Sequence, residues 1–370
     1  MRRFRIAVHA LDRTGPPMLA MSFVRWMRRE HPDVELEVVS LRGGPLIDEV
    51  VRDADAVTLL EPHEPWDLGR HDDPRAVRAR RRLDQLPRPD ATLLVSVAAG
   101  QLLPVMSHTG TLAAWVVEQG QDLHWIDEPT GLRERTDVWL AGSSSSHAEA
   151  SRRLGAPVRL VPEFVDDRAA AAEVVVARCR AALDVGDDQL LVVGAGIATR
   201  RKAPDLFMQV CAAHQRRHGA NALFLWIGGE HDDLHWPVRE EARRLGLDGF
   251  ATMESVPDLH HWLAAADVFL HTARLDAFPL VCLHSAVAGT PVAGFRGTGG
   301  TTEMFGDTFL GADYPDVEGL ADVVDSLRAP QLRERRAGEQ AHRVRSTFVT
   351  DVCAAALYES VTSRVEVGTP

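Results

Sequence analysis

The sequence predicts an α/β protein of two doubly wound domains, each a sheet with helices on both faces. Short apolar runs typical of buried strands alternate with segments of helical periodicity along the chain. Several of these runs end in polar or glycine-containing loops that lead directly into a helix. The length of 370 residues suits two domains, each long enough for its own core.

In the first half, strand-like apolar runs are separated by helical segments. We expect strands at 5–9, 34–40, 56–60, 91–97, 111–117 and 138–141. Helices are expected at 17–29, 45–53 and 73–86, the last of them rich in arginine and solvated. Four serines at 143–146 then fit either a flexible linker or a capped helix start.

The second half repeats the same rhythm. Strands are expected at 190–194, 222–227, 250–253, 268–270 and 292–295. Helices are expected at 206–218, 236–245, 259–265 and 278–288, and Gly289-Thr290-Pro291 ends the last of these. A final helix is expected at 351–361.

The segment 264–295 is the most informative part of the chain. It joins a buried strand, a polar loop and a helix start, and in an α/β sheet such a loop after the carboxyl end of a strand is where anionic ligands bind. Asp276 lies before the helix and His284 lies eight positions later, within it. A purely structural alternative is that Asp276 caps the helix beginning near Phe278.

The single lysine of the chain is the second informative feature. Lys202 follows the strand at 190–194 and precedes the next helix, whereas every other basic residue apart from histidine is arginine. A compact ammonium on a flexible stem suits the binding of a phosphate group. A solvated basic loop is the alternative interpretation.

These two segments resemble the family 4 retaining glycosyltransferases. Asp276 and His284 stand at the positions of the family's carboxylate-x7-carboxylate signature, Phe278-Pro279-Leu280-Val281 is similar to a variant of the apolar part, and Arg201-Lys202 matches its basic pair. Ala203 stands where the family has glycine, and Gly196 stands where many members have arginine. The resemblance implies the GT-B fold, in which two Rossmann-like domains face a central cleft. Members of the family also have a serine at the end of the strand expected at 138–141, followed by a helix. This feature favours a capped helix that starts near Ser145 over a flexible linker.

The resemblance further implies retaining transfer of a sugar from a nucleotide diphosphate sugar to a small-molecule or glycan acceptor, with no metal and no other cofactor. Lys202 and Arg201 would stabilise the departing diphosphate, and Asp276 would hold hydroxyls of the transferred sugar. His284 would contact the ribose, with one acceptor and one donor in place of the two oxygens of a glutamate. The glycine-rich turn at 297–303 would bind phosphate or sugar. The implied donor-binding residues are Thr14, Gly15, Gly196, Phe278, Pro279, Leu280, His284, Gly299, Gly300, Thr301 and Glu303.

In the first half the resemblance is weaker. Thr14 and Gly15 correspond to the family's glycine loop near the donor diphosphate. Many relatives carry a histidine before a glutamate at the end of the strand at 111–117, and here Val117 precedes Glu118. Glu118 and His124 are therefore the catalytic candidates of this half, with His124 in the place of the missing histidine; a surface histidine is the alternative. The implied domains are an acceptor-side domain at 1–166, a nucleotide-sugar domain at 167–345 and a returning helix at 346–370.

Composition excludes several other classes. A formal net charge of −12 argues against a nucleic-acid partner, so an anionic donor must be met by a local positive cluster. The four cysteines lack metal-ligand spacing and suggest reduced, buried thiols in a cytoplasmic protein. No apolar run has the length of a signal peptide or a membrane-spanning segment. Two alternatives to this enzyme stay open. One is a non-catalytic sugar-nucleotide-binding or partner subunit with a decayed site, and the other is an enzyme with an unusual donor. The sequence does not identify the nucleotide, the sugar, the acceptor or the oligomeric state.

Overall fold

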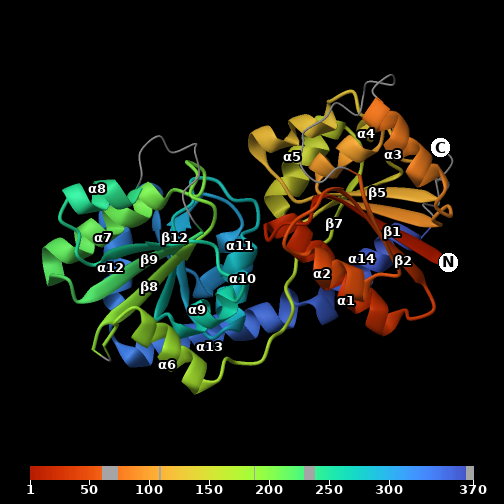
Figure 1. Cartoon of the computed structure of the whole chain (residues 1–370). Helices are drawn as coiled ribbons and strands as arrows, with labels where there is room; N and C mark the ends of the chain where they lie inside the picture. Colours follow the sequence, from red (N-terminus) through yellow and green to blue (C-terminus); the bar gives the residue numbers. More distant parts are fainter. Residues whose placement is uncertain (61–73, 108–109, 187, 229–237, 364–370) are drawn as a thin grey trace. The chain divides into compact units, whose positions relative to one another are not determined.

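The chain forms two compact units. The computed structural model describes residues 1–60, 74–107, 110–186, 188–228 and 238–363. The first unit comprises Met1–Asp166 together with Thr350–Pro370, and the second comprises Asp167–Val349. In each unit helices lie on both faces of a central sheet (Figure 1).

The first unit is built on a seven-stranded parallel sheet in the order β3-β2-β1-β4-β5-β6-β7. Its strands are β1 (Arg3–Ala10), β2 (Glu35–Arg42), β3 (Ala56–Leu59), β4 (Ala91–Val95), β5 (Thr111–Val116), β6 (Val138–Ala141) and β7 (Val158–Leu160). Its helices are α1 (Gly15–Glu30), α2 (Ile47–Asp53), α3 (Pro74–Asp84), η1 (Val97–Leu102), η2 (Gly120–Ile126), α4 (Leu132–Arg135), α5 (Ser144–Leu154) and α14 (Thr350–Thr362).

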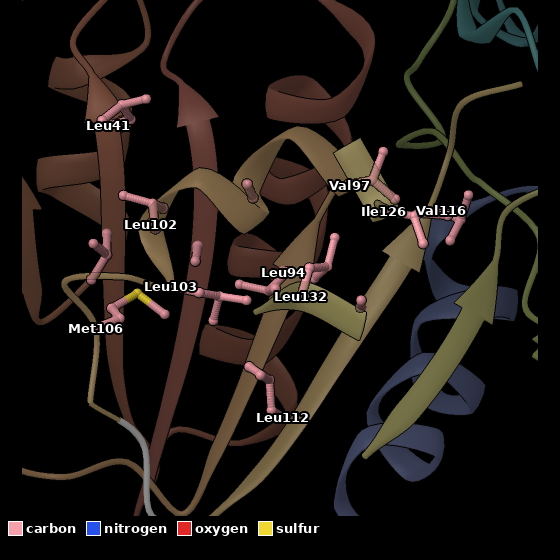
Figure 2. Close-up of a cluster of buried hydrophobic side chains, with 14 of the residues drawn as sticks. Leu41, Leu94, Val97, Leu102, Leu103, Met106, Leu112, Val116, Ile126 and Leu132 are labelled. Carbon is pink, nitrogen blue, oxygen red and sulfur yellow. The ribbon is translucent and has the colours of Figure 1, made fainter. Parts of the chain in front are cut away.

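A cluster of aliphatic side chains fills one face of this sheet. Figure 2 shows Leu41 from β2, Leu94 from β4 and Leu112 from β5 beside side chains of η1, η2 and α4. All of the labelled side chains are buried, and each stabilises the fold by roughly 1.5–3 kcal/mol through removal of apolar surface from water. The short helices that follow β4 and β5 therefore cover this face of the sheet.

The second unit is built on a six-stranded parallel sheet in the order β10-β9-β8-β11-β12-β13. Its strands are β8 (Leu190–Ala195), β9 (Ala222–Ile227), β10 (Phe250–Met253), β11 (Val268–His271), β12 (Val292–Arg296) and β13 (Leu310–Asp313). Its helices are α6 (Glu173–Ala182), α7 (Pro204–His218), α8 (Val238–Arg244), α9 (Leu259–Ala265), α10 (Leu280–Val287), α11 (Thr301–Phe305), η3 (Gly306–Thr308), α12 (Val317–Ser326) and α13 (Pro330–Thr347).

The C-terminal helix packs on the first unit. Tyr358 of α14 stacks on His31 with 4.0 Å between ring centroids, and it also contacts the rings of Phe4 and Trp26. The second unit ends at Val349, two residues after the end of α13 at Thr347.

Several predicted elements differ from the observed ones in their ends. The helix expected at 17–29 already begins at Gly15, and the strand expected at 91–97 ends at Val95, where Ser96 adopts φ +85°. The helix expected at 278–288 begins at Leu280, since Pro279 is its extended N-cap. Helices α5 and α14 cover the segments predicted near Ser145 and at 351–361. The starts of the helices expected at 73–86 and 236–245 lie outside the described residues.

The structure also bears on two expectations from composition. Cys179, Cys211, Cys282 and Cys353 are free and buried, as predicted. None of the helices in the described ranges combines the length and apolarity that crossing a bilayer requires.

Candidate active site

The site lies where the strand order of the second sheet reverses. From β8 the chain proceeds through α7 to β9 on one side, whereas β11 pairs with β8 on the other, with Val192 opposite Val268. Loops that leave the carboxyl ends of two such strands diverge and open a crevice, which is where open α/β sheets bind ligands. Lys202 lies on the loop after β8, and Asp276 lies on the loop after β11.

Hydrogen bonds hold these two loops together. The backbone N–H of Arg274 donates to the carbonyl of Arg201 at 2.8 Å, and the Thr272 hydroxyl donates to the carbonyl of Ala203 at 3.1 Å. The Arg201 guanidinium donates to the carbonyl of Leu275 at 3.2 Å. These bonds position the basic pair beside the acidic loop before any ligand binds.

Ala203 is a strained residue at the helix start. It has φ +57° and ψ +54°, the left-handed conformation that costs a residue with a Cβ roughly 1–2 kcal/mol. The family resembled here has glycine at this position, and the backbone explains that preference. The Ala203 side chain is fully buried in the core of the second unit, so its methyl group contributes packing in return.

Asp276 is the centre of the charged cluster. Its Oδ2 lies 2.5 Å from Lys202 Nζ and 3.4 Å from His271 Nε2, and its Oδ1 lies 3.6 Å from a terminal nitrogen of Arg201. The Asp276 side chain is 10% exposed and that of Lys202 is 18% exposed. The structure therefore brings together three of the predicted catalytic residues in a partly buried cluster.

The charges of this cluster follow from its contacts. Burial raises the pKa of Asp276, but the Lys202 ammonium, the His271 hydrogen bond and the Arg201 charge outweigh it, and the pKa lies well below its ordinary range. Burial lowers the pKa of His271, assisted by Lys202 and Arg201 and opposed by Asp276. His271 is thus neutral, and the two cations against one carboxylate leave a net positive charge able to attract an anion.

His271 is a site residue that the sequence analysis did not single out. Its imidazole is 5% exposed, its Nε2 faces Asp276, and its Nδ1 has no hydrogen-bond partner among the described residues. A polar residue at the last position of an apolar strand, five positions before Asp276, was the signal in the sequence.

The glycine-rich turn packs against the backbone of Asp276. The N–H of Asp276 donates to the Thr298 carbonyl at 2.9 Å, and the N–H of Gly300 donates to the Asp276 carbonyl at 3.1 Å. A Cβ on Gly299, which has φ +142°, would lie 1.7 Å from the Asp276 carbonyl oxygen. Thr301 is buried at the start of α11, and Glu303 lies two residues further. The turn therefore fixes the acidic loop, and the Gly300 amide is already engaged.

Gly196 lies against the lysine stem. It has φ +143°, and a Cβ placed there would lie 3.4 Å from Cγ and Cδ of Lys202. Its carbonyl accepts a hydrogen bond of 3.1 Å from the indole N–H of Trp226. Its predicted contact with the donor stays a prediction.

The predicted residues around α10 occupy different environments. Phe278 is buried, and its ring packs edge-on against Phe348 with 5.4 Å between centroids. Pro279 is the N-cap of α10, and no side chain caps this helix, so Asp276 is not its cap. Leu280 is the buried first residue of α10, and His284 is a half-buried residue on its second turn.

In the first unit, the predicted loop residues lie at the start of α1. Thr14 is the N-cap, and both its N–H and its hydroxyl donate to Oδ1 of Asp12, the former at 3.0 Å. Gly15 is the first residue of the helix. Asp12 therefore fixes the loop that connects β1 to α1.

Glu118 ties the carboxyl ends of β4 and β5 together. It accepts hydrogen bonds from the Ser96 hydroxyl and from the N–H groups of Val97 at 3.3 Å and Val117 at 3.0 Å. Burial raises the pKa of Glu118, and these three bonds oppose the rise. Ser96 is in the left-handed region, which sequence reasoning did not anticipate. His124 lies in η2, where its exposed Nδ1 faces the Gln121 carbonyl at 2.9 Å.

Residues 187–329 match the family model described as "Glycosyl transferases group 1". This segment is similar to the group 1 glycosyltransferases. Lys202, Asp276, His284 and the glycine-rich turn all fall within it.

Several curated glycosyltransferases match parts of the chain. A lipopolysaccharide core biosynthesis glycosyltransferase, LpsE of Rhizobium meliloti, is 33% identical over 172 residues, which are 45% of this chain and 48% of that protein. The D-inositol 3-phosphate glycosyltransferase of Kribbella flavida is 32% identical over 41% of this chain and 38% of its own length. The chain thus spans less than half the length of these two relatives. The corresponding protein of Pseudarthrobacter chlorophenolicus is 25% identical over 84% of this chain and 79% of that protein.

Solved structures establish the fold over almost the whole chain. Anabaena HepE, solved in complex with UDP-glucose, superposes with a TM-score of 0.81 at 14% identity and covers 98% of this chain and 100% of its own. WaaG, a glycosyltransferase involved in lipopolysaccharide biosynthesis, gives 0.72 at 15% identity over 98% and 100%. The fold is GT-B, with two Rossmann-like domains.

Proposed function

We propose that this protein is a retaining glycosyltransferase that moves a sugar from a nucleotide diphosphate sugar to a small-molecule or glycan acceptor without a metal ion. The observation that carries the proposal is the cluster of Lys202, Arg201 and Asp276 at the strand-order reversal of the segment that is similar to the group 1 glycosyltransferases. The relatives named above are glycosyltransferases, and HepE was solved with a UDP-sugar, which supports a donor of this kind.

The local electrostatics support binding of a diphosphate. The chain carries a formal net charge of −12, so a dianionic donor is repelled by most of the surface. Lys202 and Arg201 provide the local excess of positive charge, and neutral His271 adds none. In the proposed reaction these two cations stabilise the charge that develops on the leaving diphosphate, which is the role that a metal ion has in other transferases.

The proposal gives Asp276 and His284 different tasks. Asp276 is fully ionised, because its pKa is held well below its ordinary range, and its oxygens are strong acceptors for sugar hydroxyls. His284, on the second turn of α10, contacts the ribose of the nucleotide. Of the remaining predicted donor residues, those of the second unit lie on the loop after β8, at the start of α10 and in the glycine-rich turn with α11, whereas Thr14 and Gly15 lie at the start of α1 in the first unit.

In retaining transfer of this kind the chain supplies positioning and charge stabilisation, and the leaving diphosphate deprotonates the acceptor. Glu118 and His124 stay proposed residues of the acceptor side. The hydrogen bonds from Ser96, Val97 and Val117 support a positioning task for Glu118, since they engage its carboxylate within its own domain.

A non-catalytic subunit that binds a sugar nucleotide is the second candidate. His284 in place of an acidic residue and Val117 in place of a histidine favour it. The ion cluster favours catalysis, because a carboxylate next to a diphosphate site repels the ligand unless sugar hydroxyls satisfy it.

A two-step experiment tests the proposal. Thermal unfolding is recorded with UDP, GDP, ADP and dTDP sugars, and the donor that raises the melting temperature is then tested for hydrolysis and for transfer with retained anomeric configuration, with and without EDTA. We expect one nucleotide class to stabilise the protein and to be consumed in EDTA. Stabilisation without turnover of any donor would support the binding subunit, and inverted product would refute retention.

A further inference from the structure

A second cluster of ligand-type side chains lies at the far end of helix α7. His214 and His218 are one turn apart on α7, and Asp325 lies near the end of α12. One potential ligand atom from each of the three lies within 4.8 Å of the other two. Helices α7 and α12 lie side by side (Figure 1). Their apolar faces share a core, so the two helices hold this cluster on a rigid frame.

The tautomer of His214 is determined by its neighbours. Asn221 Oδ1 lies 2.9 Å from a terminal nitrogen of Arg328, and arginine only donates, so the amide oxygen must face this side. The same oxygen lies 3.1 Å from His214 Nε2. His214 Nε2 therefore carries a hydrogen and donates to Asn221.

In the neutral ring the other nitrogen of His214 then carries no hydrogen and can act only as an acceptor. That nitrogen, Nδ1, lies 2.6 Å from Oδ1 of Asp325, and the His214 side chain is 1% exposed. Two acceptors at this distance, one of them buried, repel each other unless a positive species lies between them. Either a proton or a metal cation meets this requirement.

The remaining geometry favours a metal. Nε2 of His218 lies 3.0 Å from Oδ2 of Asp325, so a third ligand atom faces the same carboxylate. His218 is 34% exposed, which leaves an entry path and room for a water ligand. Two histidines at i and i+4 with one carboxylate are a common zinc donor set, and Asn221 would serve as the outer hydrogen-bond partner that orients His214.

The nearby arginine is compatible with an added cation. Arg217 also contacts Asp325 Oδ2 at 3.1 Å, but it has two further acidic partners, Glu318 and, at 2.6 Å, Asp322. A small shift of Asp325 toward the histidines therefore leaves Arg217 paired. Ligand atoms of a tetrahedral zinc ion lie about 3.3 Å apart, so each ligand needs to move by less than about 1 Å.

We propose that His214, His218 and Asp325 form a binding site for one Zn²⁺ ion that links α7 to α12. The site is structural, because α7 begins at Pro204, two residues after Lys202, and its 15 residues place His218 about 20 Å along the helix axis from that end. The cation is thus separate from the proposed sugar transfer, and a failure of either proposal leaves the other unaffected.

The test uses the full chain after removal of metals with EDTA. Titration with Zn²⁺ is followed by calorimetry and by thermal unfolding, and Co²⁺ serves as a spectroscopic probe of tetrahedral coordination. We expect one ion per chain, a higher melting temperature, and visible bands of tetrahedral Co²⁺. His218→Gln should weaken Zn²⁺ binding at least tenfold and abolish the bands, and Asp325→Asn should do the same.

His342→Gln is the matched control, since His342 is an exposed histidine of α13 in the same unit. It should bind Zn²⁺ like the parent protein. Equal binding by the parent and His218→Gln would overturn the assignment. The assignment would also be overturned if Zn²⁺ and Co²⁺ produced no heat of binding, no change in melting temperature and no visible bands with the parent protein. The positive species between His214 and Asp325 would then be a proton.

Discussion

Lys202 Nζ and Asp276 Oδ2 lie 2.5 Å apart although 74 positions separate the two residues in the chain. The pairing of β8 with β11 brings their loops together at the carboxyl edge of the sheet. Asp276 also has Arg201 and His271 beside it, so the carboxylate keeps polar partners when one of them is removed. A single substitution of one of these partners therefore does not leave the Asp276 carboxylate without a polar contact.

Lys202→Ala should retain the fold and reduce turnover by about 2 kcal/mol or more of transition-state stabilisation, because the charge on the leaving diphosphate loses its closest cation. The measurement is kcat and kcat/KM with the donor identified by thermal shift. Arg200→Ala is the control, since Arg200 is an exposed basic neighbour. Equal kinetics of the two folded variants would remove Lys202 from the reaction.

Asp276→Asn should bind the free nucleoside diphosphate at least as well as the parent protein and lose most sugar transfer. The neutral amide removes a charge that repels phosphate but is a weaker acceptor for sugar hydroxyls. Nucleotide affinity and transfer rate are measured on the same preparation. Asp205→Asn, which breaks the Arg274 ion pair in the same unit, controls for lost stability. Unchanged transfer by Asp276→Asn would contradict its proposed task.

His284→Glu should raise affinity for a ribonucleoside diphosphate by up to about 1.5 kcal/mol, the scale of one charge-assisted hydrogen bond to a ribose hydroxyl. Calorimetric titration with the ribo- and 2′-deoxyribonucleotide separates this contact from a general effect of charge. Weaker binding of both nucleotides would mean that the pocket around α10 serves a different ligand group.

Stability should fall as the pH falls below the ordinary histidine pKa of 6.5, in part through His271. Burial lowers the pKa of His271, so the unfolded chain binds more protons than the folded protein in this range, and the free energy of unfolding decreases with decreasing pH. His271→Gln should reduce the slope of unfolding free energy against pH between pH 7 and the lowered pKa of His271 in the folded protein. The pKa values of His9 and His260 are also lowered, chiefly by burial, so a residual slope should persist. An unchanged slope would show that folding does not shift the pKa of His271.

The pH effect of Asp276 runs in a separate window. The pKa of Asp276 is lowered, so its contribution to stability is present above the ordinary value of 3.8 and is lost only as the pH falls below it. Unfolding curves at pH 7, 6, 5 and 3 therefore separate the two groups.

Gly299→Ala should destabilise the second unit by roughly 3 kcal/mol and remove transfer activity, because the new Cβ would lie 1.7 Å from the Asp276 carbonyl oxygen and must displace that loop. Gly297→Ala is the matched control. Gly297 also has positive φ, at +79°, but its Cβ would meet no atom within 4 Å, so only the backbone cost of about 1 kcal/mol applies. Equal unfolding free energies for the two variants would contradict a close approach at Gly299.

Local periodicity in the sequence was enough to predict most of the alternation of strands and helices, because most strands are buried and most helices have one apolar face. It was not enough for α13, whose buried face includes Gln340. The Gln340 amide accepts from the N–H of Val292 at 2.7 Å and donates to its carbonyl at 3.0 Å. A second bond runs from the Gln340 amide to the carbonyl of Thr308, so this polar residue is satisfied by backbone groups distant in the sequence and leaves no apolar signal in its own segment.

Residue types alone were enough to indicate candidates for a diphosphate site, since a single lysine and an acidic loop residue stand out against their surroundings. The pairing of β8 with β11 followed only from the folded chain, and this pairing places Lys202 beside Asp276 and buries His271 next to them. The folded chain also fixes the tautomer of His214, through Arg328 and Asn221. These properties depend on the positions and hydrogen-bonding capacity of residues far apart in the chain, and no local pattern encodes them.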